Sequence, residues 1–167
     1  SFTNDQNLID NYHKKARRGR AAPLNMVVTE TGAASAVAKC LPELKGKLTG
    51  SAIRVPTPNV SLAVMSLFVE KPVTKEALNE YLLKASLEGD LQNQIDFVNS
   101  TEAASTDFVG NRYAGIVDAQ ATLAQGNHIV LYVWYDNEFG YSRQVVRCLE
   151  ELAGVVMPNF PKRARAV

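Results

Sequence analysis

The stretch that decides the fold covers residues 128–143 and reads HIVLYVWYDNEFGYSR. Its first eight residues are mostly β-branched, aromatic or aliphatic, which is the composition of a long strand. Residues 141–153 then repeat apolar side chains at helical spacing. Between the two lie Asp136, Asn137 and Glu138, more polar groups than a buried strand-to-helix junction needs. The sequence therefore predicts a functional site at this junction.

Shorter elements precede this stretch. Further strands are expected within the ranges 24–29, 51–69 and 94–125, and two more helices within 33–41 and 75–88. The strands follow one another through turns and do not alternate with helices. This order favours an α+β fold, a largely antiparallel or mixed sheet with about three helices on one face. No glycine-rich loop joins a strand to a helix, so we expect no Rossmann domain within the chain.

The bulk composition is that of an ordinary folded domain. A hydrophobic content of 46% and a charged content of 21% argue against disorder, and a net charge of +1 gives no reason to expect nucleic acid. No apolar run is long enough to cross a membrane, so we expect a cytoplasmic protein. We expect one domain over residues 1–154 and a tail at 155–167. The chain begins at Ser1 in the middle of a pattern, which suggests a piece of a longer protein.

Two residue types that often carry chemistry give no site here. Cys40 and Cys148 lie in apolar, helix-like stretches, and we expect both to be buried and reduced. His13 and His128 have no partner at metal-ligand spacing, so no metal site is expected.

Several other residues are candidates for binding an anion. Arg54, in an apolar strand-like run, is either a solvent-facing residue of an edge strand or a fork that binds phosphate or carboxylate. Thr31 and Gly32 open a helix, whose free N–H groups favour an anion, although ordinary capping is the commoner explanation. Arg18 belongs to a basic run that is more typical of a solvated surface, and Thr3 lies in the same polar segment.

Several segments resemble, in the same order, the family of phosphorylating glyceraldehyde-3-phosphate dehydrogenases. They are SFTNDQ at 1–6, RRGRAA at 17–22, ETGAA at 30–34, LKGKLTG at 44–50, RVPTPNVS at 54–61 and WYDNEFGYS at 134–142. Each segment alone is a weak signal, but together and in register they are highly specific. The resemblance implies a C-terminal catalytic domain, with the Rossmann domain, the nucleophilic cysteine and the base histidine all expected before Ser1. It therefore implies no catalytic residue in this chain and no activity for the chain alone.

The resemblance also implies a reaction and two phosphate sites. In that glycolytic family a cysteine thiolate attacks the aldehyde, hydride passes to NAD, and inorganic phosphate releases 1,3-bisphosphoglycerate. By resemblance, Thr3 and Arg54 hold the C3 phosphate of glyceraldehyde 3-phosphate. Arg18, Thr31 and Gly32 hold the attacking inorganic phosphate.

The cofactor and the assembly follow from the same resemblance. Asn137 is expected to hydrogen-bond the nicotinamide carboxamide of NAD or NADP, and Tyr141 to pack against the ring, while the missing domain binds most of the cofactor. The family resemblance implies a homotetramer. Two alternatives stay open, an erythrose-4-phosphate dehydrogenase-like domain and a non-catalytic interaction module that reuses the fold. Thr3 and the Thr31-Gly32 pair favour the glyceraldehyde enzyme.

Overall fold

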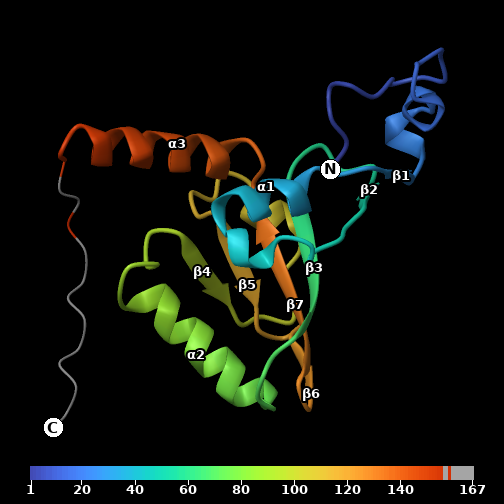
Figure 1. Ribbon diagram of the computed structural model, residues 1–167. Coiled ribbons are helices and arrows are strands. Elements are labelled where there is room, and N and C mark those ends of the chain that lie inside the picture. Colours follow the sequence, from blue (N-terminus) through green and yellow to red (C-terminus); the bar gives the residue numbers. More distant parts are fainter. Residues whose placement is uncertain (156–157, 159–167) are drawn as a thin grey trace, which may run out of the picture. The chain divides into compact units, whose positions relative to one another are not determined.

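Figure 1 shows a computed structural model of the chain, which describes residues 1–155 and residue 158. All but two residues of the predicted tail therefore lie outside the described residues. The chain divides into two compact units, Ser1–Pro58 and Asn59–Val167. The single domain expected over residues 1–154 stays a prediction.

The first unit is built around a short antiparallel pair of strands. Its elements are the 3₁₀ turns Ala16–Gly19, Ala22–Leu24 and Pro42–Leu44, strands β1 (Val27–Thr29) and β2 (Ala52–Arg54), and helix α1 (Ala33–Cys40). The long polar segment before β1 is held by its own backbone, as Asn7 donates to the Arg18 carbonyl at 3.2 Å and Asn11 donates to the Gly19 carbonyl at 2.9 Å. Gly19 is required here, because a Cβ at this position would collide with the Asn11 carbonyl oxygen.

The second unit contains a five-stranded mixed sheet. Its elements are β3 (Ser61–Phe68), α2 (Lys75–Leu87), β4 (Ile95–Val98), the 3₁₀ turn Ser105–Phe108, β5 (Gly115–Asp118), β6 (Leu123–Gln125), β7 (His128–Tyr135) and α3 (Phe139–Leu152). The strand order is β3-β7-β5-β4, with β6 also paired to β7. Only β4 and β5 are parallel. Three helices with a mixed sheet confirm the predicted α+β class, and the long strand and final helix lie where the sequence placed them.

Helix α2 begins at a side-chain cap. The Thr74 hydroxyl accepts a hydrogen bond from the Ala77 N–H at 3.2 Å, which satisfies one of the free donors of the first turn. The helix ends at Leu87, and Gly89 follows with a φ of 99°. In Figure 1, α2 runs alongside β4, so this helix covers the β4 end of the sheet.

The buried core of the second unit lies where β7 meets its neighbours. Phe108 stacks on Trp134 with ring centroids 5.3 Å apart, and Val60 and Ile116 are fully buried beside them. The Trp134 indole N–H donates to the Asp118 carboxylate at 3.0 Å, so a large ring enters the core with its polar atom satisfied. This core fixes the end of β7, from which the predicted site extends.

Several apolar side chains of β3 and both cysteines are exposed. The run 60–69 reads as a strand buried on both sides, but in β3 Val64 is 56% exposed and Phe68 is 79% exposed. The reason is that β3 lies at the edge of the sheet and pairs only with β7. The expectation of buried cysteines is also wrong, since Cys40 and Cys148 are both exposed. Among the described residues of their helices, α1 has no buried residue and α3 buries only Gly140.

Candidate functional site

The predicted site residues divide between the two units. Thr3, Arg18, Thr31, Gly32 and Arg54 belong to the first unit, and Asn137 and Tyr141 belong to the second. The anion candidates therefore share one unit, and the cofactor candidates share the other.

In the first unit, Arg18 is held by a hydroxyl of strand β1 and by a carboxylate. Its Nη2 donates to the Thr29 hydroxyl of β1 at 3.1 Å, and its Nη1 forms an ion pair with Asp5. The Thr3 hydroxyl donates to the same Asp5 carboxylate. Asp5 thus joins Thr3 to Arg18, a role that sequence reasoning missed. Its position two residues after Thr3, inside the SFTNDQ segment, is the signal that points to it.

Arg54 lies on the same face of the β1–β2 strand pair as Thr29, the residue of β1 that contacts Arg18. It is paired with Val27 across the ladder, and directly paired residues of antiparallel strands project to the same side. Val27 and Thr29 are two positions apart, so Arg54 shares their face, and the preceding residue of β2, Ile53, is 60% exposed on the other face. Arg54 is half-buried and does not lie on the outward face. It therefore differs from the solvent-facing arginine that was the first of its two sequence interpretations.

The charge of Arg54 acts close to the first residue of the chain. Ser1 is buried, and the positive charge of Arg54 acts at its backbone nitrogen. The N–H of Phe2 donates to the Thr57 carbonyl at 3.1 Å, which holds the start of the chain against the segment that follows β2. The β1–β2 strand pair therefore has three of the anion candidates beside it: Thr3, Arg18 and Arg54.

Thr31 and Gly32 lie between β1 and α1, and they show the capping function that their sequence allows. The Thr31 hydroxyl accepts from the Ala33 N–H at 3.2 Å, while Gly32 is the N-cap residue of α1. A Cβ built on Gly32 would meet no atom within 4 Å, so the start of the helix is open. Anion binding at this helix start stays a prediction.

In the second unit, Asp136 organises the junction between β7 and α3. Asp136 is only 2% exposed, and its carboxylate accepts four hydrogen bonds. One carboxylate oxygen accepts from the N–H groups of Glu138 (2.9 Å) and Phe139 (2.8 Å). The other accepts from the Gly110 N–H (2.8 Å) and from the Asn59 amide (3.0 Å). Burial raises the pKa of Asp136, but these donors outweigh burial and hold the pKa below its ordinary value.

Asn137 follows directly and is half-buried. The Ser61 hydroxyl, at the start of β3, donates to the amide oxygen of Asn137 at 3.1 Å. The register that pairs Ser61 with Tyr135 brings this strand start beside the end of β7. The sequence separation between Ser61 and Asn137 is 76 residues, so this contact has no local sequence signal.

Tyr141 lies on the first turn of α3 and is 71% exposed. The buried residue before it, Gly140, lets the helix approach the loop at residues 111–113 closely. A Cβ on Gly140 would lie 2.8 Å from the Tyr113 carbonyl oxygen. The exposed ring of Tyr141 is therefore presented by a helix start that is packed tightly at its neighbour.

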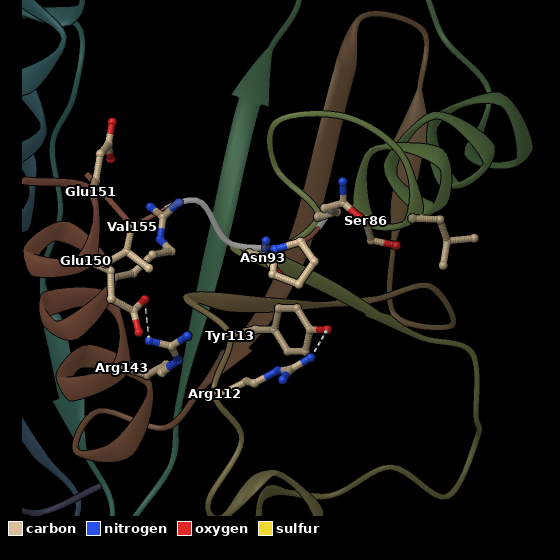
Figure 2. A pocket seen from close by; sticks show the side chains of 12 residues that line it. Ser86, Asn93, Arg112, Tyr113, Arg143, Glu150, Glu151 and Val155 are labelled. Carbon is tan, nitrogen blue, oxygen red and sulfur yellow. Dashed lines mark hydrogen bonds and ion pairs between the residues drawn. The ribbon is translucent and has the colours of Figure 1, made fainter. Parts of the chain in front are cut away.

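A separate cavity of about 470 Å³ lies between α3 and the loops near Asn93 and Arg112 (Figure 2). It contains none of the predicted site residues. Figure 2 shows two contacts among its lining residues: Arg143 bound to Glu150 at 3.1 Å, and Arg112 donating to the Tyr113 hydroxyl at 3.3 Å. We therefore place the candidate cofactor contact at the β7–α3 junction of the second unit, and the candidate anion site at the β1–β2 strand pair of the first unit.

Two kinds of feature are absent from the described part of the chain. Residues 1–155 and 158 contain no group of three or more His, Cys, Asp or Glu side chains that could hold a metal ion. Within the same residues, none of the helices combines the length and the apolar character needed to span a bilayer.

Comparison with known proteins gives a consistent set of matches. The family model for the glyceraldehyde 3-phosphate dehydrogenase C-terminal domain matches residues 1–137. A glyceraldehyde-3-phosphate dehydrogenase-like protein of Pseudomonas aeruginosa (strain UCBPP-PA14) is 67% identical over 97% of this chain and 35% of its own length. Glyceraldehyde-3-phosphate dehydrogenase 2 of Trichormus variabilis is 48% identical, and glyceraldehyde-3-phosphate dehydrogenase of Priestia megaterium is 46% identical; each match covers 92% of this chain and 45% of the relative. The chain thus spans less than half the length of these relatives.

Proposed function

Since the chain belongs to the family of the glyceraldehyde 3-phosphate dehydrogenase C-terminal domain, we propose that it is the substrate-binding half of a phosphorylating aldehyde dehydrogenase. The complete protein would oxidise glyceraldehyde 3-phosphate with NAD or NADP and transfer inorganic phosphate to the product, giving 1,3-bisphosphoglycerate in cytoplasmic glycolysis. The nucleophilic cysteine, the base histidine and most of the cofactor site would lie outside these 167 residues. The chain alone would then be inactive.

This proposal rests on the observation that Arg18 and Arg54 lie on one face of the β1–β2 strand pair. The reaction brings two phosphate groups close to one carbon atom, and two guanidinium groups are the side chains best suited to hold them. Thr3 reaches the same place through Asp5. In this proposal Thr3 and Arg54 bind the C3 phosphate, and Arg18, Thr31 and Gly32 bind inorganic phosphate.

The second unit would supply the contacts to the nicotinamide. Asn137 would hydrogen-bond its carboxamide, and the exposed ring of Tyr141 would pack against the nicotinamide ring. Asp136 would serve this function indirectly, because its four hydrogen bonds fix the backbone at the position where Asn137 leaves β7. We further propose that the complete protein is a homotetramer.

The test is steady-state kinetics of the complete protein that contains this chain, with glyceraldehyde 3-phosphate, NAD and phosphate. Wild-type protein should reduce NAD with a kcat of about 1–1000 per second, and the 167-residue chain alone should show no turnover. Arg54→Ala should raise the KM for glyceraldehyde 3-phosphate by about tenfold or more, and Arg54→Lys should restore only part of this loss, because lysine lacks the planar fork.

Arg20→Ala is the matched control. Arg20 is exposed and pairs with Asp10 at 3.1 Å, apart from the proposed site, so its removal should leave the KM unchanged. A wild-type protein that does not reduce NAD refutes the proposed reaction. An Arg54→Ala protein with the same KM as the Arg20→Ala protein refutes the assignment of Arg54.

A further inference from the structure

The start of β3 makes two side-chain contacts with the residues that follow β7. The Asn59 amide donates to Asp136 at 3.0 Å, and the Ser61 hydroxyl donates to the Asn137 amide oxygen at 3.1 Å. Asn59 and Ser61, which are two positions apart, thus contact the consecutive residues Asp136 and Asn137, respectively.

Between these two contacts lies a strained residue. Val60 has a φ of 67°, the only positive φ of a non-glycine residue in the described part of the chain. A β-branched residue rarely adopts this conformation, and such strain persists only where surrounding contacts enforce it. Here the Val60 N–H donates to the Asn59 side chain at 2.7 Å, and the Val60 side chain is buried against Phe108 and Ile116. The backbone turn at Val60 is therefore fixed, and it sets where Ser61 lies.

The contact from Ser61 distinguishes the two ends of the Asn137 amide. An asparagine amide has an acceptor oxygen at one end and a donor NH₂ group at the other, and its last torsion is broad and roughly two-fold. Because the Ser61 hydroxyl donates to the oxygen, the amide is held with its NH₂ group directed away from Ser61. A partner approaching from that side meets a donor, which pairs with a carbonyl oxygen.

We propose that Ser61 is a positioning residue that sets the orientation of the Asn137 amide, so that the Asn137 NH₂ group donates to the carbonyl oxygen of the nicotinamide carboxamide. The inference rests on the proposed function and deepens it. Without the Ser61 hydroxyl the amide oxygen loses this donor, and the orientation that offers oxygen to oxygen becomes more populated. The cofactor ring then loses the hydrogen bond that fixes which of its faces points at the substrate.

The test uses the complete protein with Ser61→Ala and two companion variants. Ser61→Thr keeps the hydroxyl group, and Ser66→Ala removes a hydroxyl from the same strand that bonds instead to His128 at 2.8 Å. We expect Ser61→Ala to raise the KM for NAD about five- to tenfold, with Ser61→Thr close to wild type and Ser66→Ala unchanged. With deuterated substrate, Ser61→Ala should also transfer measurable deuterium to the second face of the nicotinamide, which a loss of stability alone does not cause.

The outcomes separate the inference from the proposed function. A wild-type protein that does not reduce NAD overturns the proposed function and this assignment together. A wild-type protein that reduces NAD, with Ser61→Ala matching Ser66→Ala in KM and in facial selectivity, overturns the role of Ser61 alone. If Ser61→Ala unfolds, Ser61→Val decides, since it keeps the volume of threonine without its hydroxyl: wild-type behaviour in a folded Ser61→Val protein also overturns the inference.

Discussion

At the scale of single residues, Asp136 explains why so polar a sequence can follow a buried strand. A carboxylate at 2% exposure is costly unless its charge is compensated, and here four donors converge on it. Two of these are the N–H groups of Glu138, the N-cap residue of α3, and of Phe139, its first residue, so Asp136 joins the end of the strand to the start of the helix. The backbone on both sides of Asn137, the proposed cofactor contact, is therefore fixed by the buried charge of Asp136.

Asp136→Asn should reduce the free energy of unfolding by about 2–4 kcal/mol at neutral pH. The asparagine keeps one acceptor oxygen, but its NH₂ group faces the donors of Gly110 and Asn59. Urea denaturation followed by circular dichroism measures the change. Asp107→Asn, at an exposed carboxylate that accepts from Ala104 at 2.7 Å, is the control and should cost less than about 1 kcal/mol.

The pH dependence of this stability has a defined sign. The folded pKa of Asp136 is below its ordinary value, so its contribution is fully present above the unfolded pKa of about 3.9 and is lost as the pH falls through the folded value. Wild-type protein should therefore lose more stability between neutral pH and acid than Asp136→Asn does. Parallel pH profiles for the two proteins would contradict the assignment of the charge to Asp136.

At the scale of elements, helix α3 is attached to the sheet mainly at its first turn. Gly140 is the only buried residue among those of α3, and it packs against the backbone of the loop at Asn111 and Tyr113. The apolar residues further along the helix are exposed, with Leu149 at 58% and Leu152 at 84%. The start of the helix is thus positioned by one close backbone approach, while the Gln144 side chain further along donates to the Arg112 carbonyl at 3.2 Å.

Gly140→Ala should therefore destabilise the second unit by about 1–3 kcal/mol, although alanine favours helices in general. The added Cβ would lie 2.8 Å from the Tyr113 carbonyl oxygen, and backbone atoms cannot move aside cheaply. Gly50→Ala is the control, because there a Cβ would meet only an ordinary contact at 3.7 Å. Equal urea midpoints for the two variants would show that α3 does not depend on this approach.

At the scale of the whole molecule, one side of the β3 strand carries apolar side chains that the second unit leaves exposed. Leu62, Val64 and Phe68 alternate along β3 and share one face, with exposures of 37%, 56% and 79%. Their partners across the ladder are Trp134, Tyr132 and His128 of β7. Several exposed apolar side chains on one face of a strand are typical of an interface.

We therefore expect the chain to self-associate through this face. In sedimentation experiments at micromolar concentration, wild-type chain should show a mass that rises with concentration, and Val64→Glu should shift it toward the monomer. Val28→Glu is the matched control, because Val28 has a similar exposure of 49% but lies in the first unit. A wild-type monomer at every concentration would contradict this expectation, as would an equal effect of both substitutions.

The sequence by itself determined the local elements and the family. The strand at 128–135, the helix after it and the cap at Thr74 depend on side chains that are neighbours in the chain, so their patterns are readable without coordinates. The same holds for the segments that carry the resemblance, which the match over residues 1–137 supports.

Only the tertiary structure decided which side chains hold the candidate site together. Asp5 reaches Arg18 across 13 residues, and Ser61 reaches Asn137 across 76, and neither pairing leaves a periodic trace in the sequence. Exposure was decided at this level too. Val64 and Cys148 have apolar surroundings along the chain, but burial depends on whether another element covers that face, and for these two residues none among the described elements does.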